Sequence, residues 1–308
     1  MSWLKQVLQS GHFAVTAEVG PPKGSDPQVI RKKCNLLKGF VDAVNITDNQ
    51  TAIVRMSSFA SCLIAQEQGI EPVMQMVTRD RNRIALQSDF LGACALGIPN
   101  LLCLTGDHQS MGNHPQSKNV YDIDSIQLLQ IFKNMRDQKV FQNGEEVKGE
   151  MNVFLGAGES PYADPLEFRA LRLAKKIAAG AEFIQTQAIF DVDIFTQWME
   201  EVCRLGLHKK SFILAGVIPV KSAKALRYMK NEVPGVVIPD SLIERMEAAV
   251  DQKAEGVEVC IETIQKVAQI EGVSGVHIMA IAWESIVPEI VQRSGLLPRP
   301  AKGEITSS

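Results

Sequence analysis

The sequence predicts an α/β fold in which eight parallel strands and their helices close into a (β/α)8 barrel, also called a TIM barrel. Eight short and mostly apolar runs alternate with stretches of helical periodicity, a pattern typical of parallel strands covered on both faces. The length of 308 residues suits one such barrel, and no linker or low-complexity stretch divides the chain. We therefore expect a single domain over residues 1–308, with a flexible C-terminal tail from about Lys302.

The predicted strands are short, and side chains alternate between their two faces. Ala14, Thr16 and Glu18 share one face of the first strand. This face of small residues suits the crowded interior of a barrel, and it directs Glu18 inward at the mouth. The predicted strands are Phe13–Glu18, Val41–Thr47, Pro72–Thr78, Asn100–Thr105, Met151–Ala157, Glu182–Gln187, Phe212–Val217 and Gly275–Ile281.

The predicted helices lie between these strands and have recognisable ends. Asp26–Lys38 follows a Pro-Pro-Lys-Gly turn, while Asn82–Leu96 and Pro165–Ala179 each stop at a glycine. Ser241–Glu271 is too long for one ordinary helix, and we expect two helices with a break near Glu255–Gly256. The remaining predicted helices are Phe190–Leu205, Ser222–Asn231 and Ile286–Gly295.

The main alternative to the barrel is a doubly wound open sheet of the kind that binds dinucleotides. Such sheets carry a glycine-rich G-x-G-x-x-G turn after the first strand. Here the first strand ends in Glu-Val-Gly-Pro-Pro, and no such fingerprint follows it. The sequence therefore favours the barrel.

The charge and hydropathy of the chain exclude several classes of protein. Its 32 basic and 35 acidic residues give a net charge of −3, whereas nucleic-acid binders normally show a basic surplus. The longest apolar runs are far shorter than the roughly 20 residues that span a bilayer. The first residues, MSWLKQVLQSGHF, lack the apolar core of a signal peptide. We expect a cytoplasmic protein that binds neither nucleic acid nor membrane.

The cysteines and histidines show no metal-binding pattern along the sequence. None of the six cysteines belongs to a C-x-x-C pair, and the five histidines are scattered. We therefore expect buried free thiols, no metal site, and no iron–sulfur cluster held by this chain alone.

Polar residues stand at the carboxyl ends of the predicted strands, where barrels of this kind form their active sites. Each has a structural explanation as a rim residue, a cap or a turn former. Together they supply few positive charges and no metal cluster, which suits a neutral heterocycle recognised by hydrogen bonds, with one or two carboxylates left for proton chemistry. The polar strand-end residues are Glu18, Asn45, Thr47, Gln75, Thr105, Asp107, Glu159 and Gln187.

Short motifs at these strand ends also resemble one known family over nearly the whole chain, from about Phe13 to Val291. The stretch Gly106–Ser125, with Gly112-Asn113-His114-Pro115, is similar to that family's flavin-side loop. The family is methylenetetrahydrofolate reductase, a group of (β/α)8 barrels that reduce 5,10-methylenetetrahydrofolate to 5-methyltetrahydrofolate. The motifs are Ala17-Glu18-Val19-Gly20-Pro21-Pro22, Val44-Asn45-Ile46-Thr47-Asp48, Gln75-Met76-Val77-Thr78-Arg79-Asp80-Arg81-Asn82, Leu104-Thr105-Gly106-Asp107, Lys176 through Ala181, Thr186-Gln187 with Phe190-Asp191, and Gly216-Val217-Ile218-Pro219.

The resemblance implies roles for three residues on the folate side. Glu18 matches the catalytic acid, which protonates the leaving nitrogen of the substrate's imidazolidine ring and so generates the electrophilic 5-iminium cation. Asp107 matches an aspartate that hydrogen-bonds the pterin and whose charge favours the cation, and is therefore both catalytic and substrate-binding. Gln187 matches the glutamine that reads the pterin amide.

The resemblance also implies a flavin, taken as FAD, with FMN as an open alternative. Gln75 stands where a histidine is usual, and Thr105 stands where an arginine is usual. The contacts with the cofactor's ring and phosphates are therefore expected to differ from the best-known bacterial pattern. Lys176 is the natural partner for the cofactor's phosphates. The implied cofactor-binding residues are Asn45, Gln75, Arg79, Thr105, Tyr121, Asp122, Lys176 and Ala181.

The electron-donor side departs from the usual family pattern. Ala225 and Met229 stand where a glutamine and a stacking phenylalanine normally hold the nicotinamide dinucleotide, and neither can replace aromatic stacking. The chain is similar to the branch of acetogenic bacteria, whose reductases receive electrons from an iron–sulfur subunit. We therefore expect such a partner, in a homo- or hetero-oligomer.

Three other readings stay open from the sequence. One is a free-standing NAD(P)H-dependent reductase of the same family, and another is a flavin-free pterin-binding methyltransferase barrel. The third is a non-catalytic subunit of an electron-transfer complex, which the joint presence of Glu18, Asp107 and Gln187 disfavours.

Overall fold

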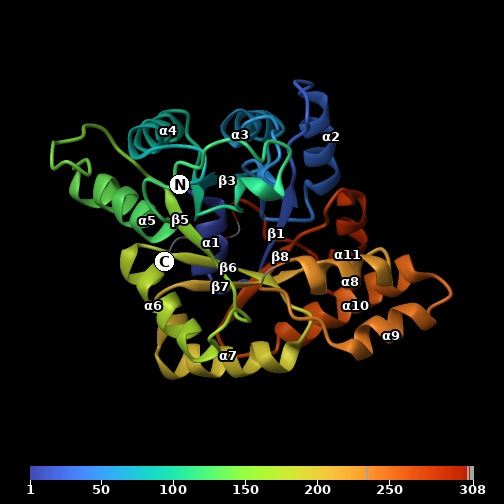
Figure 1. Cartoon of the computed structure of the whole chain (residues 1–308). Coiled ribbons are helices and arrows are strands. Elements are labelled where there is room, and N and C mark those ends of the chain that lie inside the picture. The colour runs from blue at the N-terminus through green and yellow to red at the C-terminus, as the bar shows by residue number, and fades with distance from the viewer. Residues whose placement is uncertain (234, 304, 306–308) are drawn as a thin grey trace.

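The computed structural model describes residues 1–233, 235–303 and 305, and within them eight parallel strands close a barrel (Figure 1). The strands follow one another around the barrel in chain order, and β8 pairs with β1. The predicted (β/α)8 barrel is thus confirmed, and the open-sheet alternative is wrong. The strands are β1 Ala14–Val19, β2 Ala43–Ile46, β3 Pro72–Val77, β4 Asn100–Leu104, β5 Phe154–Glu159, β6 Phe183–Ala188, β7 Phe212–Val217 and β8 Val273–Ile278.

Helices surround the barrel on its outer face (Figure 1). Their apolar sides and the outward-facing strand residues form one large hydrophobic core. None of the helices in the described ranges is long and apolar enough to cross a bilayer. The helices are α1 Trp3–Gln9, α2 Gln28–Leu37, α3 Ser58–Glu67, α4 Arg83–Ala95, α5 Ser125–Lys133, α6 Arg169–Ala179, α7 Val192–Arg204, α8 Ala223–Glu232, α9 Asp240–Ala248, α10 Gln252–Val267 and α11 Val287–Arg293.

The long helical stretch does break into two helices, but the predicted position near Glu255–Gly256 is wrong. α9 ends at Ala248, and α10 begins at Gln252 after Asp251, whose side chain caps the new helix. Gly256 lies inside α10, where an added Cβ would come within 1.8 Å of the Val220 carbonyl oxygen. This glycine therefore serves close packing and does not end a helix.

Three helices of the structure, α1, α3 and α5, are missing from the sequence prediction. α5 carries a signal that could have revealed it, because Asp124 and Gln127 form a reciprocal capping box at its start. α3 mixes small, polar and apolar residues without a clear apolar stripe, so its periodicity is weak.

The amino-terminal end of the barrel is filled by an apolar plug of inward-facing residues. α1 lies across this end and closes it with Trp3, Leu4, Val7 and Leu8. Gly156 is required here, because an added Cβ would lie 2.3 Å from the Phe183 ring. The strand residues of the plug are Ala14, Ala43, Val73, Leu102, Phe154, Phe183 and Leu214.

The C-terminal segment runs back to the amino-terminal end of the barrel. The Arg299 guanidinium pairs with the buried Asp42 at 2.5 Å and donates to the Phe13 carbonyl. Ile305 packs against the apolar plug. Of the tail predicted from Lys302, residues 304 and 306–308 lie outside the described residues.

Candidate active site

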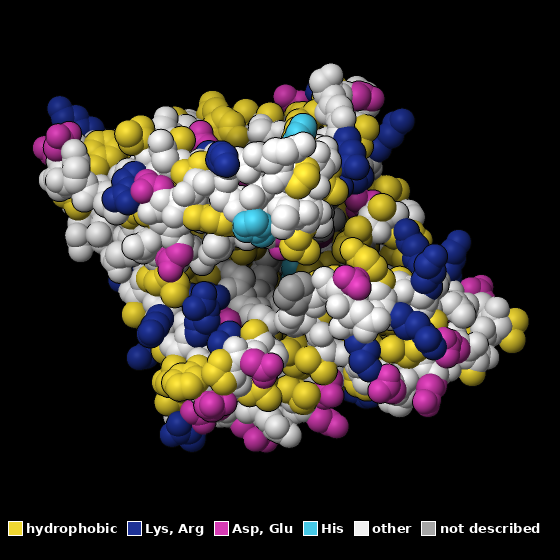
Figure 2. Space-filling view, in the orientation of Figure 1, with side chains coloured by type: hydrophobic (Ala, Val, Ile, Leu, Met, Phe, Trp, Pro, Cys, Tyr) yellow, Lys and Arg dark blue, Asp and Glu magenta, His cyan; other side chains and the backbone are white. Residues whose placement is uncertain are grey.

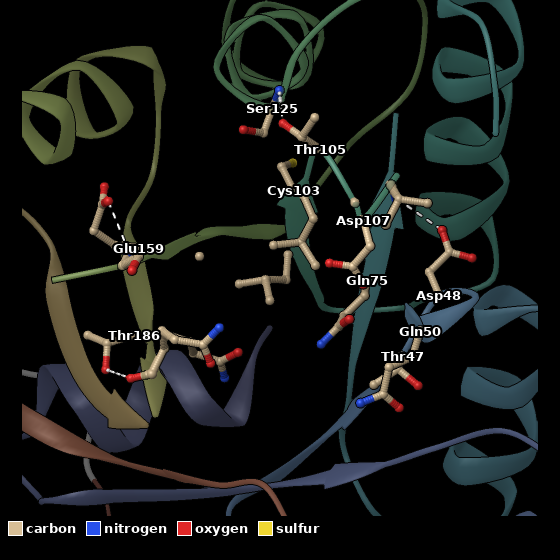
Figure 3. A pocket seen from close by; sticks show the side chains of 18 of the residues that line it. Thr47, Asp48, Gln50, Gln75, Cys103, Thr105, Asp107, Ser125, Glu159 and Thr186 are labelled. Atoms are coloured by element: carbon tan, nitrogen blue, oxygen red, sulfur yellow. Dashed lines mark hydrogen bonds between the residues drawn. The ribbon is translucent and has the colours of Figure 1, made fainter. Parts of the chain in front are cut away.

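A pocket of about 500 Å³ opens at the carboxyl ends of the strands, opposite the plug. Figure 2 shows the hollow in this face of the molecule. Its volume lies in the range of small-molecule and cofactor sites. Figure 3 shows Gln75 and Asp107 on one wall of the pocket and Glu159 on the facing wall.

The fold brings most of the predicted site residues to this pocket. Asn45 lies just below it, and the Tyr121 hydroxyl donates to the Asp107 carbonyl oxygen over 3.3 Å at its rim. Nine of the predicted residues line it directly: Glu18, Thr47, Gln75, Arg79, Thr105, Asp107, Glu159, Lys176 and Gln187.

Two residues implied by the family resemblance do not reach the pocket. Asp122 forms an ion pair with Arg83 at the start of α4, over 2.7 Å, and that contact lowers the Asp122 pKa to about 2. Ala181 precedes β6, at the opposite end of the barrel, where its N–H donates to the Lys176 carbonyl. Neither position supports direct contact with a ligand in this pocket.

The floor of the pocket is a layer of buried polar side chains. Gln185 exchanges two hydrogen bonds with Asn45, at 2.5 and 3.0 Å, and also contacts Thr16 at 3.3 Å. The Thr16 hydroxyl in turn lies 2.9 Å from Nδ1 of His277. Burial lowers the His277 pKa to about 3, so this imidazole is neutral near pH 7. The layer separates the pocket from the apolar plug and fixes the floor of the site.

Glu18 is the acid that the fold places at the wall of the pocket. It is the next-to-last residue of β1, is 9% exposed, and accepts a hydrogen bond from Gln50 Nε2 over 3.0 Å. Burial raises the pKa of Glu18 to about 7, with a further upward contribution from the charge of Glu284. The Gln50 hydrogen bond, Lys33 and Arg55 act in the opposite direction. Glu18 can therefore carry a proton near neutral pH, as a general acid must.

Asp107 and Arg79 lie at the mouth, in loops that follow neighbouring strands. The exposed Asp107 carboxylate accepts from the Thr51 N–H over 3.2 Å. Arg79 is buried, donates twice to Asp80 at 2.7 Å, and holds the Asp107 carbonyl at 3.0 Å. Arg79 thus fixes the loop that carries Asp107, and its charge is already paired with Asp80.

Lys176 is buried at the base of the facing wall. Its Nζ lies 3.0 Å from Glu159 and 2.5 Å from the Gly158 carbonyl, and burial lowers its pKa. Arg169 and Arg172 also line the pocket, and neither is among the residues predicted from the sequence. The i, i+3, i+7 spacing of Arg169, Arg172 and Lys176 on α6 could have revealed this basic stripe.

Ala225 and Met229 lie on α8, and neither lines the main pocket. Met229 packs against a separate apolar cluster that includes Leu226 and Met246. The structure therefore shows no aromatic group at these two positions that could stack on a dinucleotide.

All six cysteines are free thiols, and Cys34, Cys62, Cys103 and Cys260 are buried as predicted. The fold adds one grouping that the sequence spacing hides. Cys203, His208 and Glu271 meet near the starts of β7 and β8, with their ligand atoms within 4.8 Å of one another. This group lies at the plugged end of the barrel, away from the pocket.

A TIM barrel with a buried acid, a polar floor and a basic stripe around an open pocket at the carboxyl ends of its strands has the construction of an enzyme. The family model described as methylenetetrahydrofolate reductase matches residues 3–295. The chain therefore belongs to the methylenetetrahydrofolate reductase family, which confirms the resemblance seen in its motifs.

Individual relatives agree with this assignment at low identity. Methylenetetrahydrofolate reductase 2 of Schizosaccharomyces pombe is 24% identical over 306 residues, and the match covers 95% of this chain but 47% of that protein. The chain thus spans about half the length of this relative. The 5,10-methylenetetrahydrofolate reductase of Pectobacterium carotovorum is 23% identical, with 95% of this chain and 93% of that protein covered.

A solved structure from Clostridium thermocellum shares the fold. It has a TM-score of 0.68 and 15% identity, and the match covers 95% of this chain and 98% of that one. It is described as an uncharacterized protein that binds two copies of 5-methyl-5,6,7,8-tetrahydrofolic acid.

Proposed function

We propose that this protein reduces 5,10-methylenetetrahydrofolate to 5-methyltetrahydrofolate in one-carbon metabolism. The reaction adds one hydride and one proton to the substrate and breaks one carbon–nitrogen bond. The observation that carries the proposal is Glu18, a buried acid with a pKa of about 7 on the wall of an open pocket in a chain of this family. The folate bound by the structurally similar Clostridium thermocellum protein supports the same substrate class.

The proton comes from Glu18. In its protonated form it donates to the leaving nitrogen of the imidazolidine ring, and the ring opens to the 5-iminium cation. A positioned acid of matched pKa contributes roughly 10²–10⁴-fold to such a step. The carboxylate that remains is stabilised by the 3.0 Å hydrogen bond from Gln50.

Asp107 and Gln187 orient the pterin in this proposal. The Asp107 carboxylate accepts hydrogen bonds from the pterin edge, and its negative charge favours the iminium cation electrostatically. Gln187 lies on β6, where its own Oε1 is held by the Ala188 N–H over 3.0 Å, and the fixed amide reads the pterin amide.

The pocket residues fit a flavin, which we propose to be FAD. When bound in its reduced form, a flavin supplies the hydride. Gln75 and Thr105 offer an amide and a hydroxyl for polar ring edges, and Arg169 and Arg172 offer guanidinium groups for phosphates. Lys176 adds positive charge to the same wall, although its pairing with Glu159 reduces what it can offer a phosphate.

The proposed electron donor is a separate iron–sulfur protein. Ala225 and Met229 remove the usual support for a nicotinamide dinucleotide, and no cysteine spacing in the sequence would let this chain hold a cluster itself. We expect slow or undetectable oxidation of NADH and NADPH by the isolated chain, and brisk turnover with a small artificial dye. An NADH-driven rate equal to the dye-driven rate would favour the free-standing reductase instead.

The test begins with the absorption spectrum of the purified protein. A bound flavin, identified by mass after heat release, separates the reductase from a flavin-free methyltransferase and distinguishes FAD from FMN. The flavin is then reduced anaerobically with dye and mixed with methylenetetrahydrofolate. Formation of 5-methyltetrahydrofolate together with flavin reoxidation supports the proposal, and reduced flavin that persists contradicts it.

A further inference from the structure

Glu18 borders a second cavity in addition to the main pocket. This side cavity has a volume of about 70 Å³, and its wall includes Lys33, Arg55 and Glu284. Ile281 also lines it and is 55% exposed, so the cavity extends from Glu18 towards the surface. A polar cavity of this volume has room for water.

Three charged groups face Glu18 from the elements around this side cavity. Lys33 of α2 forms an ion pair with Glu284 over 2.6 Å and donates to the Gly20 carbonyl over 2.9 Å. Glu284 follows β8 and is 8% exposed. Arg55 donates to the Pro21 carbonyl over 3.0 Å, and its buried Nε has no partner within the described residues. The neutral His277 lines the main pocket together with Glu18.

The proposed reaction removes one proton from Glu18 in every turnover. Folate and flavin bound in the main pocket would cover that side of the carboxyl group, so the replacement proton needs another path. The side cavity offers one, because it borders Glu18 through Lys33, Arg55 and Glu284, none of which lines the main pocket.

We propose, building on the function proposed above, that the side cavity is the proton inlet of this enzyme and that Glu284, on the wall of that cavity, is a positioning residue whose negative charge adds to the effect of burial in favouring the acid form of Glu18. In each turnover the Glu18 carboxyl loses its proton to the leaving nitrogen. The resulting carboxylate then takes one proton from solvent through water in the side cavity, and no electron moves in this step. The negative charge of Glu284 favours protonated Glu18, whereas the positive charges of Lys33 and Arg55 oppose it.

The electrostatic part is tested by two substitutions with opposite expected effects. Glu284→Gln removes a negative charge beside Glu18, so the Glu18 pKa should fall, while Lys33→Met removes a positive charge, so it should rise. The readout is the Glu18 carboxyl titration by ¹³C NMR of the labelled protein, assigned by its loss in Glu18→Gln. A fall of about one unit from 7 would lower the protonated fraction at pH 7 roughly fivefold.

Glu201→Gln is the matched control for charge removal. Glu201 also belongs to a 2.6 Å ion pair, but on the exposed surface of α7. It should leave the Glu18 titration unchanged. Unshifted titrations in Glu284→Gln and Lys33→Met, or shifts in the same direction, would overturn the role of Glu284.

The inlet itself is tested by narrowing the side cavity with Gly20→Val. Gly20 has room for a Cβ, since the nearest atom is Gln50 Oε1 at 3.8 Å, and it does not line the main pocket. At pH 6, where Glu18 starts protonated, the first turnover should match wild type, while steady-state turnover with saturating dye and folate should fall several-fold. Equal steady-state rates would overturn the inlet. A wild-type enzyme that never reoxidises its flavin with folate would instead refute the proposed function, whereas the NMR titrations do not depend on it.

Discussion

The two ends of the barrel lumen are built from the same strands but have opposite chemistry. At the amino-terminal end, Phe154 and Phe183 stack at 4.8 Å inside an apolar plug that α1 covers. At the carboxyl end, the same strands present a polar floor and then Glu18, Gln75 and Gln187 around an open pocket. The amino-terminal end contributes to the stability of the fold. The carboxyl end holds the Glu18 carboxyl group, whose ionisation is disfavoured by burial.

Residues that stabilise the fold and residues that line the pocket lie very close together in the sequence. Ala14, Thr16 and Glu18 are alternate residues of one strand, and they enter the plug, the polar floor and the pocket wall in turn. Substitutions at the two ends should therefore separate stability from activity, and each prediction below tests that separation.

The largest stability effect is expected at the plug. Phe183→Ala removes a fully buried ring stacked on Phe154, and should lower the free energy of unfolding by about 3–5 kcal/mol while the folded fraction keeps its folate activity. Denaturant unfolding measures the loss. Phe168→Ala, at a ring that is 53% exposed, is the control and should change stability by less than about 0.5 kcal/mol. A loss below about 1 kcal/mol at Phe183 would contradict the stabilising role of the plug.

Glu18→Gln, at the pocket, should raise the free energy of unfolding at alkaline pH, whereas Phe183→Ala lowers it. The folded-state pKa is raised from 4.5 to about 7, so the folded protein holds its proton more tightly, and wild-type stability falls as pH rises through 7. The gain in the Gln variant should be about 2–3 kcal/mol greater at pH 8.5 than at pH 5. Thermal melts at the two pH values decide this, and a gain independent of pH would mean that Glu18 ionises normally.

Asp107→Asn should have a smaller effect, confined to the folate reaction. The exposed carboxylate contributes little to stability, but an amide no longer favours the cation and presents a donor where an acceptor is wanted. We expect the folate step to slow about tenfold, or roughly 1.4 kcal/mol, with the melting temperature unchanged. If the Asp107→Asn variant has wild-type kinetics, the role of Asp107 is structural: it accepts a hydrogen bond from the Thr51 N–H in the loop at the mouth of the pocket.

Strand positions and the inward direction of Glu18 could be predicted because both depend on local periodicity. The floor could not, since Asn45 and Gln185 are 140 residues apart and meet only when the barrel closes. For the same reason the sequence hid the meeting of Cys203, His208 and Glu271. Asp122 failed to reach the pocket because a nearby arginine, Arg83, holds it at the start of α4.

Helix boundaries were the other source of error, and the reason is tertiary contact. Gly256 has the sequence signature of a break, yet it lies within α10, where the Val220 carbonyl oxygen leaves no room for a Cβ. A glycine can allow another segment to pack closely against a helix, or it can end the helix. The sequence alone does not distinguish these two roles.

A single-turnover measurement on wild type and Glu18→Gln shows whether Glu18 supplies the proton. Each protein is reduced anaerobically with dye and mixed with methylenetetrahydrofolate at pH 7, and flavin reoxidation is followed by absorbance. We expect both proteins to bind flavin and accept electrons at similar rates, while flavin reoxidation is at least roughly tenfold to a hundredfold slower in Glu18→Gln. Equal reoxidation rates would show that Glu18 does not supply the proton, and would contradict the account.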